Sequence, residues 1–209
     1  MADRAARPAF DFVWLASQSP RRRQLLTQIG VRHELLLADA AEDAEALEAE
    51  RPNEAPEDYV RRVTLAKLAA AQRRHAARGL PAAPILCADT TVVLGRTVLG
   101  KPRDAADATA MLERLSGHTH RVLSAVAIRH GRRARSALSV SRVRFGPLDD
   151  AWIAGYVASG EPFGKAGAYA IQGAVAAHVE RIEGSYSGIM GLPLYETAQL
   201  LAKAGVRMS

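Results

Sequence analysis

Residues 87–104 read CADTTVVLGRTVLGKPRD, and this stretch decides how the rest of the chain can be arranged. It continues an apolar run, Ile85–Ala88, that is typical of a buried strand. Asp89 stands where this run stops, at the expected strand end. A β-branched run, Thr91–Leu94, follows and turns back at a Gly-Arg pair, so a hairpin is expected. Lys101 then lies one hairpin's length away from Asp89.

An acid and a cation brought to one cleft in this way suit phosphate chemistry. The carboxylate of Asp89 can hold a divalent metal or take a proton from water, and the ammonium group of Lys101 can neutralise a phosphate oxygen. A strand-end turn with a surface salt bridge fits the same residues, and on these residues alone it is the commoner interpretation. The rest of the chain has to decide between the two.

Composition is typical of one globular domain spanning residues 1–209, with residues 1–10 expected to be disordered. Hydrophobic residues make up 48% of the chain, and no apolar run approaches the roughly 20 residues of a membrane helix. A membrane partner is therefore not expected. The single cysteine, Cys87, rules out an internal disulfide framework and favours a reducing, cytoplasmic location.

Charge is unevenly distributed along the chain. Residues 38–58 hold nine acids and one base, so the remainder carries +14 against a net charge of +6 for the whole chain. A basic body of this kind attracts nucleic acid, nucleotides or another polyanion. Because aromatic residues are only 5% of the chain, a small phosphorylated ligand is at least as well supported as a nucleic acid.

The N-terminal region predicts an anion site. A buried strand over Phe12–Ala16 leads into Ser17, and Ser19 with the following proline marks the start of a short helix that ends at Gly30. Free backbone N–H groups and the helix dipole favour negative charge at such a start. The arginines at positions 21–23 are unfavourable beside the positive end of the helix dipole, and a bound anion would explain their presence. A solvated basic helix start without an anion is about equally common.

Further elements follow from periodicity and turn residues. Lys67 falls within an apolar stripe of a long helix, where a lysine either extends to solvent or meets a buried anion. Glu42 is the acid best placed, after a second strand, to reach a cleft. The expected elements are a strand at 31–37, an acidic and partly helical segment after it, a helix at 57–78, a helix capped by Asp104 and closed by Gly117, strands at 119–128 and 134–145 forming a hairpin, a helix at 148–158, and a final helix from Pro193.

Two other features carry candidate chemistry. His118 and His120 alternate at the start of a strand, where two histidines could bind metal, but a structural role is favoured because no further Cys/His cluster supports a site. The glycine-rich segment 160–173 is predicted to be a flexible loop leading into a short strand, with Gln172 near its end. An amide side chain there could read a base edge. A strand at 175–182 is expected next.

Several of these segments together resemble the Maf family of nucleoside triphosphate pyrophosphatases. The matching pieces, in order, are ASQSPRR at 16–22, ADT at 88–90, GKPRD at 100–104, LSGxxH at 115–120, GKAGAYxIQG at 164–173 and GLPL at 191–194. Each piece is weak alone, but six in order are very specific. The resemblance implies an α/β fold with a curved mixed sheet flanked by helices, two lobes around a central cleft, and a homodimer.

The resemblance also implies an activity and its residues. It implies metal-assisted hydrolysis of a nucleoside triphosphate, with Mg²⁺ or Mn²⁺, to the monophosphate and pyrophosphate. The implied catalytic residues are Asp89 as proton acceptor and metal ligand, Glu42 as the second metal-site acid, and Lys101. The implied substrate-binding residues are Ser17, Arg21, Arg22, Lys67, Thr90, Lys165 and Gln172, of which Arg22, Thr90 and Gln172 select the base.

In the details of these motifs, the chain resembles the branch of the family that acts on dTTP and UTP. The alternatives left open are a pyrophosphatase for 7-methyl-GTP or another non-standard nucleotide, and a non-catalytic nucleotide- or nucleic-acid-binding division regulator. The sequence departs from the family pattern at two positions. Ala41 precedes Glu42 where the family usually has a second acid, and Gly164 replaces the usual acid before Lys165.

Overall fold

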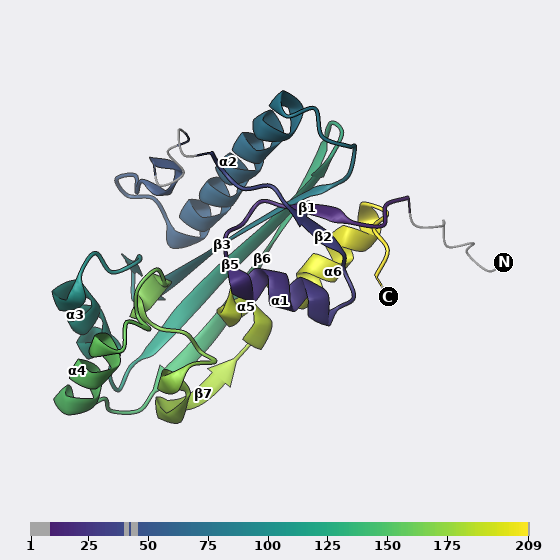
Figure 1. Ribbon diagram of the computed structural model, residues 1–209. Helices are drawn as coiled ribbons and strands as arrows, with labels where there is room; N and C mark the ends of the chain where they lie inside the picture. The colour runs from purple at the N-terminus through teal and green to yellow at the C-terminus, as the bar shows by residue number, and fades with distance from the viewer. Residues whose placement is uncertain (1–8, 40–41, 43–45, 209) are drawn as a thin grey trace.

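The computed structural model describes residues 9–39, 42 and 46–208, and its described part has an α/β fold (Figure 1). A mixed seven-stranded sheet is flanked by helices, as the sequence predicts. The elements in chain order are β1 (Val13–Leu15), α1 (Pro20–Gln28), β2 (His33–Leu35), η1 (Ala46–Glu48), α2 (Pro56–Ala77), β3 (Ile85–Leu94), β4 (Thr97–Leu99), α3 (Ala105–Leu115), β5 (Thr119–His130), β6 (Arg133–Phe145), α4 (Asp150–Ala158), η2 (Ala166–Ala168), η3 (Ala174–His178), β7 (Val179–Glu183), α5 (Tyr186–Met190) and α6 (Leu194–Lys203).

Strand order explains how the sheet is built. The order is β2-β1-β3-β5-β6-β7, with β4 paired to β3 alone. β1 runs parallel to both β2 and β3, whereas β3, β5, β6 and β7 pair in antiparallel fashion. The predicted hairpin of two long strands is β5 and β6, whose turn places Gly131 at φ 56°, a conformation that glycine adopts without strain. Within the described residues the sheet is open.

The run around Asp89 differs from the prediction in one respect that matters for the site. Asp89 does not end a strand: it lies in the middle of β3, which pairs with β5 without interruption from Ile85 to Val93. The backbone of Asp89 stays in the ladder opposite Ala125, so a carboxylate side chain does not stop the strand. Successive side chains of a strand point to opposite faces. Asp89 and Thr90 therefore leave the sheet on different sides.

Helices cover both faces of this strand. Figure 1 shows α2 on one side of the long strands and α1 with α6 on the other. Cys87 and Ile85 pack in a cluster with Leu68 of α2, while Leu86 and Ala88 pack with α1 and α6. By the same alternation Asp89 leaves the sheet toward α2, and Thr90 leaves it toward α1.

A separate core region lies at the far end of the sheet. There α3 and α4 pack against Val92, Val122 and Phe145, together with Tyr169 from the glycine-rich segment. Asp104 caps α3 by accepting from the backbone N–H of Asp107 at 2.8 Å, as predicted. The protein thus has one core region around α1, α2 and α6 and another around α3 and α4.

The C-terminal third departs from the sequence expectations. The short strand expected before Gln172 is absent from the described structure: residues 169–173 are turn and irregular backbone after η2. The strand predicted at 175–182 is instead η3 followed by β7, because only residues from Val179 onward find a ladder partner, on β6. The sequence also missed α5. The final helix begins at Leu194, one residue after Pro193.

The expectation for the first ten residues is only partly testable. Residues 1–8 lie outside the described residues. Residues 9 and 10 are ordered, which corrects the prediction for these two: the backbone N–H groups of Ala9 and Phe10 both donate to the carbonyl of Gly205, at 2.8 and 3.0 Å. Phe10 also forms a parallel bridge with Val206. No helix among the described residues is long and apolar enough to cross a membrane.

Candidate active site

A large cleft lies between the two core regions and has a volume of about 970 Å³. Its walls come from the start of α1, from α2, from β3, from the turn after β4 and from the glycine-rich segment. Every catalytic and substrate-binding residue that the family resemblance implies lines it. Its charged lining residues are seven bases and three acids: Arg21, Arg22, Lys67, Arg73, Arg74, Lys101, Lys165, Glu42, Glu48 and Asp89. A net charge of +4 makes the cleft attractive to a polyanion.

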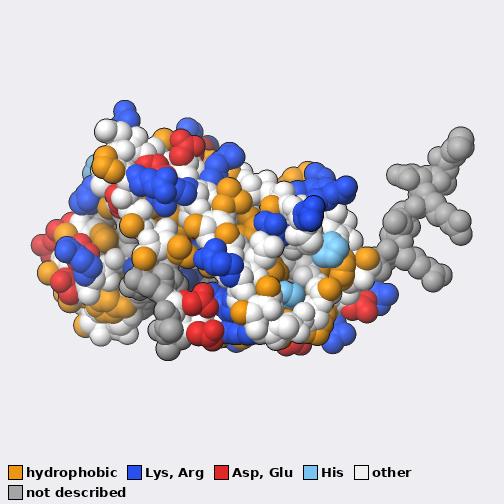
Figure 2. Space-filling view, turned by 90° about the horizontal axis from the view of Figure 1, so that it is seen from above, with side chains coloured by type: hydrophobic (Ala, Val, Ile, Leu, Met, Phe, Trp, Pro, Cys, Tyr) orange, Lys and Arg blue, Asp and Glu red, His pale blue; other side chains and the backbone are white. Residues whose placement is uncertain are grey.

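One face of the molecule shows how basic side chains are distributed outside a single cluster. On the face seen in Figure 2, the Lys and Arg side chains of the described residues stand in separate groups among hydrophobic and neutral atoms. The concentration of cations in the cleft favours an anionic ligand that enters the cleft.

The start of α1 forms one wall, and its capping agrees with the sequence prediction. The hydroxyl of Ser19 accepts from the backbone N–H of Arg22 at 3.5 Å, and Pro20 occupies the first turn. The hydroxyl of Ser17 accepts from the backbone N–H of Ser19 and from Nη1 of Arg22, both at 3.2 Å. The first turn holds no acidic residue. Ser17 and Arg22 are thereby held at a helix start that favours anions.

Arg22 and Thr90 meet across this wall. Arg22 donates from Nε to the carbonyl of Gly191 at 2.8 Å and from Nη2 to the hydroxyl of Thr90 at 3.4 Å. The Thr90 hydroxyl lies 2.9 Å from that of Ser124, which donates to the carbonyl of Gly188 at 2.6 Å. Arg22 and Thr90, two of the three residues expected to select the base, are therefore joined in one hydrogen-bonded network. Ser124 also belongs to this network, and no pattern in the sequence pointed to it.

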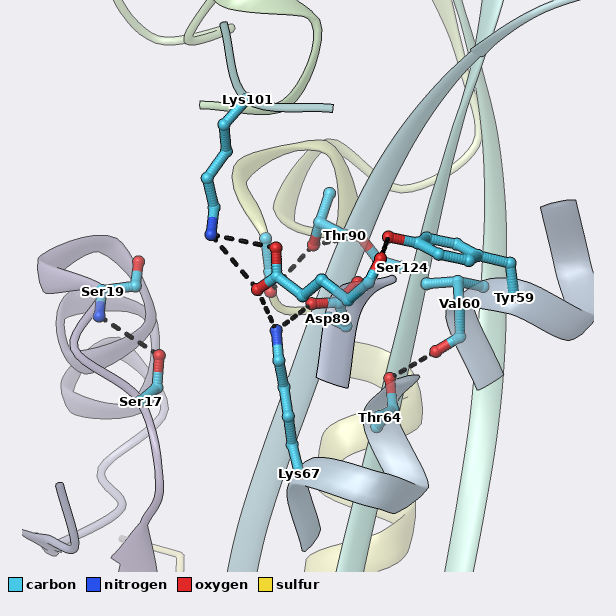
Figure 3. A network of polar contacts seen from close by, with 12 residues as sticks. Ser17, Ser19, Tyr59, Val60, Thr64, Lys67, Asp89, Thr90, Lys101 and Ser124 are labelled. Carbon is cyan, nitrogen blue, oxygen red and sulfur yellow. Dashed lines mark hydrogen bonds and ion pairs between the residues drawn. The ribbon is translucent and has the colours of Figure 1, made fainter. Parts of the chain in front are cut away.

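Asp89 and Lys67 form the centre of the cleft. The ammonium group of Lys67 donates to Oδ1 of Asp89 at 2.5 Å, which shows that this lysine of the α2 stripe meets an acid rather than extending to solvent (Figure 3). Burial disfavours the charged form of Lys67, but the nearby carboxylates of Asp89 and Glu48 outweigh burial and raise its pKa. Lys67 is therefore a fixed positive charge beside the candidate base.

Glu48 is the acid that the sequence analysis missed. Its Oε1 accepts from Lys67 at 2.7 Å, and its Oε2 accepts from Lys101 at 3.0 Å. Figure 3 shows the ends of Lys67 and Lys101 approaching the same space from opposite sides, next to Asp89. Nothing in the sequence singled out Glu48 among the nine acids of residues 38–58, because its partners lie 19 and 53 residues away.

Glu42 lies in the cleft wall with a different partner. Its two carboxylate oxygens accept from Nε and Nη2 of Arg74, each at 2.7 Å. Arg74 is itself buried and donates to the carbonyl of Leu36 at 2.7 Å. Hydrogen bonds from Arg74 lower the pKa of Glu42 to about 2, so this carboxylate is charged at neutral pH. Ala41, the departure from the family pattern, lies outside the described residues.

The glycine-rich segment supplies the last wall. Lys165 donates to the carbonyl of Glu161, and its pKa is lowered by burial and by the nearby charge of Arg21. Burial also lowers the pKa of Arg21, whose Nε donates to the carbonyl of Met190 at 3.3 Å. Two neighbouring cations in a partly buried wall disfavour each other's charge, and a bound anion would relieve this cost. Gln172 is exposed on the same wall, as base reading would require.

The two histidines singled out from the sequence have separate surroundings. His120 is buried, and its Nε2 lies 2.8 Å from the hydroxyl of Tyr169. Its ring packs edge-on against Phe145 and Tyr169. His118 is exposed and contacts the carbonyl of Ser116 through Nδ1. His120 thus fastens the glycine-rich segment to β5, which agrees with the structural role that the sequence favoured.

These features together define an α/β protein with a cation-lined cleft around a carboxylate, an arrangement that suits a polyphosphate anion. Comparison with known proteins makes this more specific. A family model described as Maf-like protein matches residues 12–204, and the chain belongs to this family.

Curated relatives of the chain are similar over nearly its whole length. A protein of Polaromonas sp. named dTTP/UTP pyrophosphatase is 62% identical over 201 residues, which is 96% of this chain and 100% of the relative. A protein of Cupriavidus metallidurans with the same name is 65% identical over 194 residues, covering 93% of this chain and 97% of the relative. A third, from Ralstonia nicotianae, is 64% identical and covers 94% and 95%.

Proposed function

We propose that this protein is a nucleoside triphosphate pyrophosphatase that hydrolyses dTTP and UTP to the monophosphate and pyrophosphate. The observation that carries the proposal is the placement of Asp89 in the middle of a cleft lined by cations from α1, α2 and the turn after β4. The names of the relatives at 62–65% identity supply the bond that is cut and the bases that are accepted.

The proposed chemistry uses few protein groups. Water attacks the α-phosphorus while Asp89 takes its proton, and the bond from the α-phosphorus to the bridging oxygen breaks, so that pyrophosphate leaves with that oxygen. Lys67 and Lys101 offset the charge of the leaving pyrophosphate. Arg21, from the start of α1, and Lys165, from the glycine-rich segment, bind the phosphates from two other walls. Positioned bases and fixed cations of this kind are the main protein contributions to phosphoryl transfer.

A divalent cation fits the donor set of this cleft. Mg²⁺ binds through one or two carboxylates together with substrate phosphates, and so it does not need a dedicated cluster of protein ligands. Such a cluster, of three or more His, Cys, Asp or Glu residues, is absent from the described part of the chain. Asp89 and Glu42 are the proposed ligands. Oε2 of Glu42 retains a lone pair beyond its bond to Arg74, whereas Oε1 also accepts from the backbone N–H of Asp39 at 3.4 Å. The metal, Mg²⁺ or Mn²⁺, would neutralise phosphate charge.

Base selection is assigned to the network of Arg22 and Thr90, together with Gln172. The amide of Gln172 presents both a donor and an acceptor, which suits the O4 and N3–H edge shared by thymine and uracil. We further infer that the protein works in the cytoplasm, as a homodimer, on free nucleotides. The cations concentrated in the cleft support a nucleotide over a nucleic acid as its partner.

One assay tests this function. Pyrophosphate release is measured with dTTP, UTP, CTP, ITP and 7-methyl-GTP, with Mg²⁺, with Mn²⁺ and with a chelator. We expect metal-dependent, saturable release that is fastest with dTTP and UTP. Fastest release from 7-methyl-GTP or ITP would move the protein to another branch of substrates. No release from any nucleotide, with tight binding retained, would indicate a non-catalytic nucleotide-binding protein.

Asp89→Asn tests the role of the carboxylate in the same assay. The substitution keeps the size of the side chain but removes the proton acceptor, so kcat for dTTP should fall by about 10²–10⁴-fold. Asp58→Asn, on the exposed first turn of α2 and outside the cleft, is the matched control and should leave kcat unchanged. Near-normal kcat in Asp89→Asn would show that another group accepts the proton.

A further inference from the structure

Glu161 lies outside the cleft but contacts the glycine-rich segment that forms one of its walls. Its carboxylate accepts from the hydroxyl of Tyr156 at 3.0 Å through Oε1, and from the backbone N–H of Ala174 at 3.4 Å through Oε2. Its main-chain carbonyl accepts from the ammonium group of Lys165. One residue thus contacts the segment near both of its ends, at Lys165 and two residues after Gln172.

The end of α4 holds Glu161 in position. The backbone N–H of Glu161 donates to the hydroxyl of Ser159 at 3.2 Å, and that hydroxyl donates to the carbonyl of Tyr156 at 2.6 Å. Tyr156 is buried, and its ring stacks on that of Trp152 with 4.8 Å between the ring centroids. Because Tyr156 belongs to the core region around α3 and α4, Glu161 links the glycine-rich segment to a packed helix.

The carboxylate of Glu161 lies directly against the backbone of Gly173. A Cβ added to Gly173 would lie 1.8 Å from Oε1 of Glu161 and 2.7 Å from its Cδ, so only glycine leaves room for the carboxylate where it lies. The backbone conformation makes no such demand, because Gly173 is extended with φ −95°, which other residues also adopt. The contact with Glu161 is therefore the reason for a glycine at position 173.

Gln172 lies in a short span of exposed or partly exposed residues between two buried ones, Ile171 and Val175. These two pack in the core region around α3 and α4, which holds the chain on either side of the span. Within the span, Glu161 contacts the backbone of residues 173 and 174. The piece of backbone that carries the Gln172 amide is therefore restrained by Glu161.

We propose that Glu161 is a positioning residue for base selection, which holds Gln172 in place and thereby sets the discrimination between uracil and cytosine. This inference deepens the proposed function and rests on it. Uracil presents an acceptor at O4 and a donor at N3, whereas cytosine presents a donor at N4 and an acceptor at N3. Hydrogen-bonding groups that are held in place reject the wrong base because they are left unpaired beside it. A Gln172 amide with more freedom adapts to either base.

A purely structural role for Glu161 leads to a different expectation. If Glu161 only tied the segment to α4, its loss would lower kcat/KM for every nucleotide in the same proportion. The positioning role is favoured because both oxygens of the Glu161 carboxylate contact the two residues that directly follow Gln172. The ratio of kcat/KM for UTP to that for CTP distinguishes the two roles.

This ratio is measured for the wild-type chain, Glu161→Ala, Glu161→Gln and Glu113→Ala. Glu161→Ala should lower the ratio about tenfold, because the backbone beside Gln172 is no longer restrained. Glu161→Gln should retain most of the ratio, since a glutamine side chain can still accept from Ala174 and pair with the hydroxyl of Tyr156. Glu113 is exposed on α3 and does not line the cleft, so Glu113→Ala is the matched control and should equal the wild type.

Gly173→Ala gives an independent test of the same contact. The added methyl group takes the place of Oε1 of Glu161, so the carboxylate has to move away and the ratio should again fall about tenfold. In Glu161→Ala that space is free, and adding Gly173→Ala should cause no further loss. Losses that multiply to about a hundredfold in the double variant would show that the two residues act separately, and would overturn the proposal.

The remaining outcomes are equally decisive. An unchanged UTP-to-CTP ratio in Glu161→Ala, or a wild type that does not discriminate between the two nucleotides, overturns the proposal. Gly173→Ala carries the test should Glu161→Ala fail to fold. A wild type that releases no pyrophosphate refutes the proposed function separately. The ratio is then taken from the Kd values of UTP and CTP, measured by calorimetry with a chelator, and the same expectations hold for the variants.

Discussion

Neighbouring side chains in this protein have different tasks because of their positions along one strand. Asp89 and Thr90 are adjacent in sequence, yet Asp89 meets Lys67 from α2 and Thr90 meets Arg22 from α1. The two-residue repeat of a β-strand explains the separation. One strand thereby supplies a candidate base to one side of the cleft and a candidate base-selecting hydroxyl to the other.

The buried ring of His120 should make the stability of the protein depend on pH. Desolvation lowers the pKa of His120 to about 4, while Tyr169, its hydrogen-bond partner, has a raised pKa and does not titrate in the acid range. The unfolded chain binds a proton at His120 below about pH 6.5, whereas the folded chain stays neutral there until about pH 4. The free energy of unfolding should therefore fall as pH drops from 6.5 to 4, by up to about 3 kcal/mol from this group.

Urea unfolding at pH 7.0, 5.5 and 4.5 measures this effect. His120→Gln removes the titrating ring, so the stability difference between wild type and variant should shrink steadily as pH falls. His118→Gln, at an exposed position, is the control for loss of an imidazole ring and should leave the free energy of unfolding at pH 7.0 close to that of the wild type. A constant difference between wild type and His120→Gln would mean that the folded protein protonates His120 as readily as the unfolded chain does.

At the scale of elements, the glycine-rich segment depends on close packing against β3. Gly167 in η2 has φ +69°, and a Cβ added there would lie 2.8–2.9 Å from three side-chain atoms of Val92. The segment carries Lys165 and ends near Gln172, and both residues line the cleft. The packing of Gly167 against Val92 of β3 therefore helps to position them. Gly164, where the family usually has an acid, also has a left-handed φ of +71°.

Gly167→Ala should therefore be costly. The left-handed backbone costs alanine about 1 kcal/mol, and overpacking against Val92 should add about 1–3 kcal/mol. Gly164→Ala is a matched control, because its φ is similar but no atom lies within 4 Å of the added Cβ. Gly164→Ala should lose only the stability that the left-handed backbone costs, about 1 kcal/mol. Urea unfolding of both variants, and of Gly167→Ala combined with Val92→Ala, separates the two costs. Equal losses for the two glycine variants would rule out the packing contribution.

At the scale of the whole molecule, the cleft joins two core regions. One region is formed around α1, α2 and α6, the other around α3 and α4, and the cleft is lined by residues from both. The triphosphate proposed for the cleft is opposite in charge to the net charge of the lining residues. A ligand of this kind ties the two regions together electrostatically.

Ligand binding should therefore stabilise the molecule as one unit. A non-hydrolysable dTTP analogue with Mg²⁺ at 100 times its Kd should raise the free energy of unfolding by about 2.7 kcal/mol, in a single urea transition. At the same concentration dTMP, which lacks the pyrophosphate part, should stabilise less. Two transitions, of which only one moves with the analogue, would show that the ligand contacts one region alone.

Local patterns in the sequence predicted much of the fold. The caps at Ser19 and Asp104, the hairpin of β5 and β6 and the stripe of α2 all depend on neighbouring residues, so they could be predicted without knowledge of contacts. The predictions for the C-terminal third were less accurate. Whether residues 169–178 extend or turn depends on which of them find a ladder partner on β6, and that partner is distant in sequence.

In the candidate site, too, local motifs predicted some features and only long-range contacts decided the others. The sequence by itself determined the family pattern and most of the candidate residues that line the cleft, because most of these lie in short motifs of fixed spacing. Only the tertiary structure decided their partners. It places Asp89 within a continuous strand, pairs Glu42 with Arg74, and brings Glu48 to Lys67 and Lys101. Ion pairs across 19–53 residues depend on how helices pack on a sheet, and no local spacing encodes that packing.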